Sequence, residues 1–255
     1  MSVTGISNIS SYERVSNGNK INSASDNASG LAISEKLESQ SKALSQSSDN
    51  ASSGKDLLNV ADNSLSNIND SLQRIYELSL KASNGTNSSD DLSAIQDEIS
   101  QMKSGIQDAA KNTQFNQLNL LDGSMADIHL ATDPSGGGLK IELYNSTLEA
   151  LGIADYNVTS TFDITDIEDA LKQVSSARSS IGAQSNVLDS ITSYNNSAAF
   201  NNDSALSTIK DADLYEEITQ KKQDDIMQQY KIFTQKAQVD QESSFNKVIG
   251  LDPNN

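Results

Sequence analysis

The sequence predicts a mainly α-helical protein: an elongated antiparallel helical bundle or coiled coil built from an N-terminal and a C-terminal arm, with a small central β-hairpin region. Apolar residues recur at helical and seven-residue spacings in both halves of the chain. No proline occurs between Pro134 and Pro253, which permits long helices. The hydrophobic fraction is only 35%, so we expect narrow apolar seams in place of a large compact core.

The first arm begins with a seven-residue repeat between about residues 28 and 82. This pattern is the a/d seam of a coiled coil and predicts one long helix or two in line. In its first half, Gln40, Ser47 and Gly54 occupy the second apolar position, which suits close packing in a multi-helix bundle. The apolar members are Leu37, Leu44, Ala51, Leu58, Leu65 and Leu72, and Ala61, Ile68 and Ile75 lie three residues after Leu58, Leu65 and Leu72 respectively.

A second helix is expected after a break at residues 83–91, which are rich in turn formers and helix caps. Its apolar pattern is the most regular in the chain. The short connection predicts that it folds back antiparallel on the first helix. Its seam consists of Leu92, Ile95, Ile99, Met102, Ile106 and Ala109.

In the middle of the chain the helical spacing of apolar residues ends. Residues 111–127 are expected to form a loop with apolar anchors. Two alternating runs, IHLATD and LKIELY, then flank PSGGG, and this arrangement is typical of a β-hairpin. A further strand or turn is expected before Phe162. The loop anchors are Phe115, Leu118, Leu120 and Leu121, and alternation places Leu139, Ile141 and Leu143 on one side of the hairpin.

The C-terminal arm is expected to open with a capping box formed by Thr165 and Glu168. Residues 195–203 carry few apolar side chains and predict either a polar stretch of helix or a hinge. A looser stripe follows from Leu206 to about Lys247. The first stripe contains Ile167, Leu171, Val174, Ala177, Ile181, Leu188, Ile191 and Tyr194, and the second contains Ile209, Ile218, Ile226, Tyr230 and Phe233.

These patterns divide the chain into five parts. Each helix has too narrow an apolar face to be stable alone, so the two ends of the chain are expected to meet, and contacts between copies are a second way to cover the helices. The parts are an N-terminal segment and loop (1–27), an N-terminal helical core arm (28–124), a β-rich insert (125–164), a C-terminal helical core arm (165–194), and a C-terminal helix with a polar tail (195–255). The predicted core seam comprises Leu58, Leu65, Leu72, Ile95, Ile99, Ile106, Leu171, Ile181 and Leu188.

Charge and composition exclude several classes of function. The net charge of −17 argues against binding nucleic acid and against a polybasic membrane-surface role. The absence of cysteine excludes disulfides, thiolate metal sites and thiol catalysis. No run is long and apolar enough to predict membrane insertion. The first residues lack the pattern of a Sec signal peptide, so secretion would need another export route.

No catalytic residue, metal ligand or cofactor site is predicted, and the chain is not expected to be an enzyme. His129 is the only histidine and is assigned a structural or surface role. Nothing resembles a nucleophile elbow. The acidic clusters lack the spacing of an EF-hand, and no glycine loop has the context of a phosphate-binding motif.

Six blocks of sequence resemble the bacterial flagellin family, in the order in which that family carries them. They are RVSNGNKINSASDNASGLAISEKL (14–37), SLQRIYELSLKASNGT (71–86), AIQDEISQMKSGI (94–106), NTQFNQLNLLDGS (112–124), ALKQVSSARSSIGAQSNVLDS (170–190) and STIKDADLYEEITQKKQDDIMQQ (207–229). The resemblance implies a structural subunit of the extracellular flagellar filament, serving motility. It also implies export through the flagellar type III apparatus without a cleaved Sec signal peptide, and assembly with other flagellin subunits, as a homo- or hetero-polymer, through coiled-coil packing of the terminal helices.

Both ends depart from the family pattern. Only thirteen residues precede Arg14, and the C-terminal segment is more charged and polar than is usual for the family. An alternative therefore stays open. The chain would then be a minor flagellin, or a secreted flagellin-like binding module that does not polymerise alone and contacts a host receptor.

The resemblance also implies a receptor-contact surface. Arg74 and Leu78 are four residues apart and share a helix face, and Glu98 is expected on the antiparallel neighbour. In flagellins the matching positions contribute to recognition by the mammalian innate immune receptor for flagellin. The other interpretation is that Leu78 lies at the edge of the seam. Arg74 and Glu98 would then form an ordinary ion pair, worth less than about 1 kcal/mol.

Overall fold

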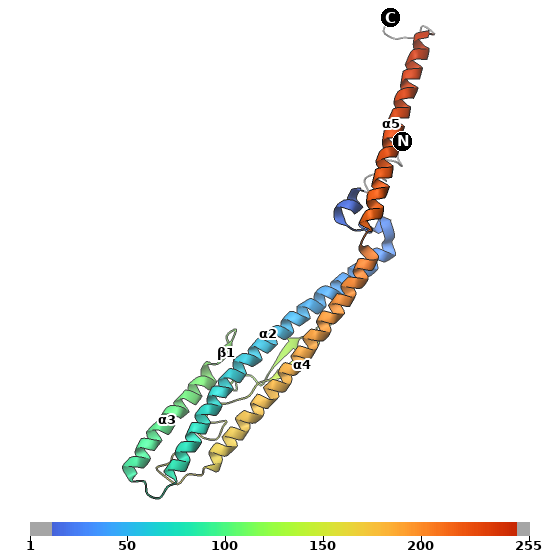
Figure 1. Cartoon of the computed structure of the whole chain (residues 1–255). Helices are drawn as coiled ribbons and strands as arrows, with labels where there is room; N and C mark the ends of the chain where they lie inside the picture. The colour runs from blue at the N-terminus through green and yellow to red at the C-terminus, as the bar shows by residue number, and fades with distance from the viewer. Residues whose placement is uncertain (1–11, 249–255) are drawn as a thin grey trace. The chain divides into compact units, whose positions relative to one another are not determined.

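The computed structural model describes residues 12–248, with side chains to residue 245. The long helices are α2 (Ala24–Ala82), α3 (Ser89–Asn112), α4 (Thr165–Lys210) and α5 (Leu214–Val248) (Figure 1). Between α3 and α4 lie the short strands β1 (Gln114–Phe115), β2 (Leu118–Asn119), β3 (Asp127–Ala131) and β4 (Gly138–Glu142). The mainly α fold with a small β-hairpin region is confirmed. The outermost parts of the predicted N-terminal segment and polar tail lie outside the described residues.

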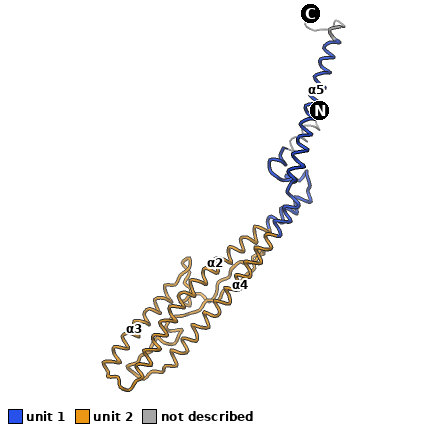
Figure 2. Tube along the Cα trace, viewed as in Figure 1, with its two compact units in different colours: residues 1–39, 201–255 blue, residues 40–200 orange. Residues whose placement is uncertain are grey.

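The chain forms two compact units (Figure 2). The larger unit comprises residues 40–200. The smaller unit comprises residues 1–39 and 201–255. Each unit is described by itself below.

In the larger unit, α2 lies between α3 and α4 and runs antiparallel to both (Figure 1). Its helix is uninterrupted after the non-helical residue Asn27, so the predicted repeat forms one helix and not two in line. Ion pairs join α2 to each neighbour, through Arg74 and Glu98 on one side and Asp62 and Arg178 on the other. Because α2 has two helical partners, its buried face is broader than a two-helix seam requires.

The turn between α2 and α3 is where the sequence predicts a break. Helix α3 begins at Ser89, and Ser88 is its N-cap: the hydroxyl of Ser88 accepts a hydrogen bond from the Asp91 amide, and the Asp91 carboxylate accepts one from the Ser88 amide. This capping box satisfies backbone donors that the first helical turn would otherwise leave without a partner.

The predicted central hairpin is confirmed by β3 and β4, which pair antiparallel with Ile128 opposite Ile141 and His129 opposite Lys140. A second, smaller hairpin of β1 and β2 replaces the loop expected there. Its two turn residues, Asn116 and Gln117, have φ angles of 48° and 66°, the left-handed backbone that hairpin turns of type I′ require.

The four apolar anchors expected in this region differ in how far they are buried. Leu120 and Leu121 are buried, and Phe115 packs against the core. Leu118 is exposed because it stands at the turn of the small hairpin, so its assignment as an anchor is wrong. The region through Phe162 forms turns and adds no strand.

The larger hairpin is held between α2 and α4. The side chain of Leu130 fills the space beside Gly54 of α2, where any larger residue would overlap it. Asn50 of α2 donates a hydrogen bond to the carbonyl oxygen of Ala131 (2.8 Å), and the buried Asn195 of α4 donates one to that of Thr132 (3.1 Å). Gly54, one of the non-apolar positions of the repeat, therefore receives the insert.

Helix α4 begins differently from the prediction. Thr165 is the first helical residue, and the carboxylate of Asp163 accepts its amide hydrogen bond (2.9 Å). The carboxylate of Glu168 instead accepts a hydrogen bond from the Tyr76 hydroxyl (3.2 Å). The predicted capping box of Thr165 and Glu168 is therefore wrong, because Asp163 stands closer to the first free amide groups.

Residues 195–203 continue α4 without a hinge, so the polar-helix alternative is correct. The buried face passes through Asn195 and Ala199. Tyr194 is 71% exposed, and its place in the buried stripe is wrong.

In the smaller unit, residues 18–20 pair with residues 210–212. The Lys20 amide donates to the carbonyl oxygen of Lys210 (2.7 Å), and the Ala212 amide donates to that of Gly18 (2.9 Å). Helix α5 then starts after Asp213, whose carboxylate accepts hydrogen bonds from the amides of Tyr215 and Glu216. The sequence did not predict this break between α4 and α5.

Candidate functional site

The predicted core seam meets at the centre of the larger unit. All its members except Leu171 are at most 5% exposed. Leu171 is partly buried and packs against the same core. The members come from α2, α3 and α4, so three helices share one apolar interior.

Arg74 and Glu98 lie side by side on the surface of the larger unit. Atoms Nε and Nη2 of Arg74 donate to Oε1 of Glu98 at 2.8 and 2.6 Å, and Nη1 donates to Oε2 of Glu77 at 3.0 Å. The hydrogen bond to Glu98, followed by the one to Glu77, raises the pKa of Arg74. The side chains of Arg74 and Glu98 are 49% and 41% exposed, so this cluster presents charge to solvent.

Leu78 does not share that surface. It is 3% exposed and belongs to the core, because α2 is covered on two sides at this level. The structure therefore brings Arg74 and Glu98 together with Glu77, and places Leu78 beneath them in the interior. Sequence reasoning missed Glu77, although its spacing of three residues from Arg74 is a recognised helix pairing.

Polar groups inside the larger unit hold the loop that follows the hairpin. Nζ of Lys103 donates to the carbonyl oxygens of Ala154 (2.6 Å) and Tyr156 (3.1 Å). Burial lowers the pKa of Lys103, and the charge of Asp155 opposes that effect. The hydroxyl of Tyr156 bonds to Oγ of Ser79 (2.8 Å), and burial raises the pKa of Tyr156. These contacts position the insert.

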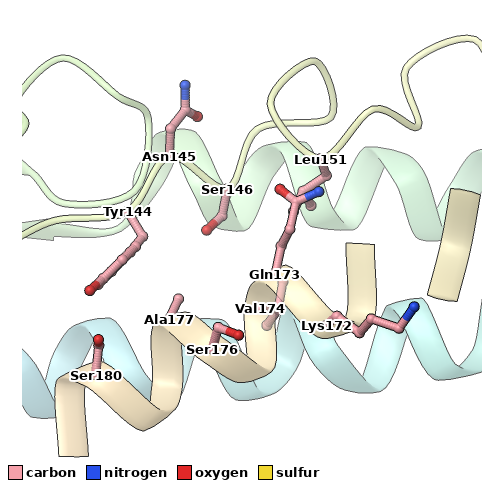
Figure 3. A pocket seen from close by; sticks show the side chains of 10 residues that line it. All are labelled: Tyr144, Asn145, Ser146, Leu151, Lys172, Gln173, Val174, Ser176, Ala177 and Ser180. Atoms are coloured by element: carbon pink, nitrogen blue, oxygen red, sulfur yellow. The ribbon is translucent and has the colours of Figure 1, made fainter. Parts of the chain in front are cut away.

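A hollow of about 420 Å³ lies between the insert and α4 (Figure 3). The stretch from Tyr144 to Ser146 forms one side, and residues of α4 from Lys172 to Ser180 form the other. Nζ of Lys172 is bound by the carboxylate of Asp169 (2.8 Å). The lining offers hydroxyl and amide groups, which can form hydrogen bonds but include no nucleophile paired with a base.

Within residues 12–248, no three His, Cys, Asp or Glu side chains lie close enough together to hold a metal ion. Over the same stretch, no helix combines the length and apolar character needed to cross a membrane. His129 is exposed on β3, opposite Lys140.

Most of the exposed large apolar side chains of the described residues belong to α5 in the smaller unit. Ten of its large apolar side chains are at least 41% exposed. At about 100° per residue they spread over roughly two thirds of the helix circumference. The remaining third is a polar stripe that includes Glu217, Lys231 and Gln238. The exposed side chains are Leu214, Tyr215, Ile218, Ile226, Met227, Tyr230, Ile232, Phe233, Val239 and Phe245.

Four members of this α5 surface, Ile218, Ile226, Tyr230 and Phe233, belong to the looser stripe that the sequence predicts. The other members stand on further sides of the same helix and were not predicted. Plotting every apolar residue around the helix axis, instead of following one face, would have revealed the breadth of the surface.

Comparison with known proteins agrees with this architecture. The chain matches the bacterial flagellin N-terminal helical region over residues 7–126 and the bacterial flagellin C-terminal helical region over residues 164–243. It is 35% identical over 226 residues to a flagellin of Halalkalibacterium halodurans, covering 85% of this chain and 82% of that protein. It is 33% identical over 237 residues to the flagellar filament 33 kDa core protein of Treponema phagedenis, covering 84% and 82%.

A solved structure supports the same assignment. The crystal structure of Bacillus cereus flagellin aligns with a TM-score of 0.52 and 26% sequence identity, covering 58% of this chain and 88% of that one. The chain therefore belongs to the bacterial flagellin family, the structural subunits of the flagellar filament.

Proposed function

We propose that this chain assembles into the flagellar filament by packing α5 against neighbouring flagellin subunits. The exposed apolar surface of α5 is the observation that carries this proposal. Monomeric proteins rarely leave so many large apolar side chains of one helix in water. A helix that exposes apolar side chains on most of its circumference needs more than one neighbour, and a polymer supplies several.

The assembly proposal is tested with purified chain, alone and added to sheared flagellar filaments. Sedimentation and electron microscopy should show polymer. Replacing Tyr230 and Phe233 by serine should leave the helical content unchanged and prevent assembly. Replacing Gln235 and Gln238 by serine is the matched control on the polar stripe and should leave assembly intact. Monomers of the unaltered chain that persist under both conditions would contradict the proposal.

We also propose that the chain acts outside the cell, after leaving through the flagellar export apparatus without a cleaved Sec signal peptide, and that it has no enzymatic activity. The six ordered flagellin-like blocks support this route, and the lack of cysteine is compatible with it. In a strain without the export apparatus, the chain should stay inside the cells. Its appearance in the medium of that strain would contradict the proposed route.

A second candidate function is recognition by a host receptor, as a secreted module or minor flagellin. The exposed cluster of Arg74, Glu98 and Glu77 favours this candidate, and Leu78 would support the cluster from below. Direct binding to the mammalian flagellin receptor would be measured for Arg74→Ala and Glu98→Ala, with Lys81→Ala as an exposed control cation. Filaments of normal length and composition after deletion of the gene would favour this function over a major structural one.

A further inference from the structure

Helix α4 carries two apolar stripes, and only one of them is buried. The second stripe repeats at spacings of three and four residues, like the first. At about 100° per residue, its members lie within about 80° of one another and about 100° around the helix from the buried stripe. The buried stripe includes Ile181, Leu188, Asn195 and Ala199, and the second stripe consists of Ala183, Val187, Ile191, Tyr194 and Ala198.

The second stripe lies at the edge of the buried face of α4, where Ile191 still packs against the core of the larger unit and its neighbours Val187 and Tyr194 reach solvent. Val187 is 45% exposed and Tyr194 is 71% exposed, while Ile191 between them is partly buried. A shallow hollow of about 390 Å³ runs along these three residues. The stripe extends for about 22 Å along the helix axis. Single exposed apolar residues are ordinary, but an aligned row of this length is typical of an interaction surface.

The length of α4 that carries the stripe has almost no charge of its own. Between Gly182 and Asn202 the only charged residue is Asp189, and its carboxylate is bound by Nζ of Lys55 at 2.6 Å. The whole chain has a net charge of −17, so copies of it repel each other across most of their surfaces. An uncharged strip is where two such copies can approach without that repulsion.

The polar side chains beside the stripe are already satisfied within the helix. The hydroxyl of Ser190 donates to the carbonyl oxygen of Asn186 (2.9 Å), and the hydroxyl of Ser197 donates to that of Ser193 (2.8 Å). A donor that keeps its hydrogen bond loses little when water is removed from it. The edges of the stripe can therefore be covered at low cost.

We propose that the second stripe of α4 is a contact surface for another copy of this chain. The proposal rests on the filament function proposed above and names a surface of the larger unit that this function would use. The uncharged strip fits a partner that carries the same negative charge. A strongly basic partner would find no complementary charge there.

The test compares the assembly of purified variants, alone and on sheared filament seeds, by sedimentation and electron microscopy. Val187→Asp places a charge in the stripe and should raise the concentration needed for assembly at least tenfold. Tyr194→Ser removes apolar surface without adding charge and should raise it severalfold. Both side chains are exposed, so circular dichroism and the thermal unfolding midpoint should match those of the unaltered chain.

Ser193→Asp is the matched control, because it adds the same charge to the same helix about 120° away from the centre of the stripe. It should assemble like the unaltered chain. The inference is overturned if Val187→Asp and Tyr194→Ser assemble like this control. If Val187→Asp alone perturbs the fold, Tyr194→Ser decides. Failure of the unaltered chain to assemble or to join seeds would instead overturn the proposed function, and the inference with it.

Discussion

Arg178 of α4 and Asp62 of α2 form a two-point ion pair that joins the C-terminal and N-terminal arms. Nε of Arg178 donates to Oδ1 of Asp62 at 2.9 Å, and Nη2 lies 3.4 Å from Oδ2, across 116 residues of sequence. The geometry fixes how the two helices align along their length. Both side chains are more than one third exposed, so solvent screens the pair.

We therefore predict a small coupling energy for this pair. A double-mutant cycle with Asp62→Asn and Arg178→Gln, read by urea unfolding, should give a coupling below about 1 kcal/mol. The coupling should shrink further when salt is added. A coupling of several kcal/mol would mean that the pair stabilises the fold far more than its exposure implies.

Substitutions in the core seam shared by α2, α3 and α4 should lower the free energy of unfolding much more than loss of this ion pair. Leu65 and Ile99 are fully buried, so Leu65→Asp or Ile99→Asp places a charge where it has no partner. Each should lower the free energy of unfolding by more than about 3 kcal/mol. Ser104→Asp, on an exposed face of α3, is the control and should change it by less than about 0.5 kcal/mol. Thermal unfolding of the seam variants at the midpoint of the unaltered chain would contradict their assignment to the interior.

We expect the buried side chain of Asn195 to contribute to the stability of the fold. It is 2% exposed and donates to the carbonyl oxygen of Thr132, so Asn195→Ala removes the hydrogen bond that ties α4 to the hairpin. We expect a loss of about 1–3 kcal/mol and faster amide hydrogen exchange in β3 and β4. Asn186→Ala, on an exposed turn of the same helix, should alter neither measurement.

Low pH should destabilise the N-termini of α3 and α4. The hydroxyl of Ser88 and then its amide hold the pKa of Asp91 below the ordinary value, and the amide of Thr165 does the same for the pKa of Asp163. A carboxylate with a lowered folded-state pKa contributes stability that is present above the unfolded pKa of about 3.9 and is lost as the pH falls through the folded value.

We therefore expect the thermal midpoint to fall as the pH drops from about 5 to about 2. The fall should be less steep in the double variant Asp91→Asn, Asp163→Asn, which cannot titrate at these positions. Parallel midpoint curves for the two proteins down to the lowest pH would refute the assigned role of the two carboxylates.

The features best predicted from the sequence are those that depend only on the contact between one helix or strand and its nearest neighbour. The repeat of α2 and the alternation of β3 and β4 each follow from which side of the element meets apolar groups. The exposure of Tyr194 and the burial of Leu78 depend instead on how many neighbouring helices pack against α4 and α2. The spacing of apolar residues along one helix does not reveal how many neighbours that helix has.

Other differences arose from competition between similar local signals. Asp163 and Thr165 both have side chains that cap helices, and it is the carboxylate of Asp163 that accepts the Thr165 amide. Asp213 likewise starts α5 inside a stretch whose apolar spacing continues across it. The turn at Asn116 and Gln117 lacks the glycine that usually marks a type I′ hairpin, so no sequence signal predicts a hairpin there.

The placement of α2 between α3 and α4 has a consequence for the order of folding. α3 follows α2 after a short turn and can pair with it quickly, whereas α4 starts only at Thr165. Contacts between segments so far apart in sequence form late, because a long loop must close first. On the export route proposed above, whichever end of the chain leaves the channel first, one side of α2 stays uncovered until both arms have emerged. On that route the topology delays closure of the core until most of the chain has been translocated.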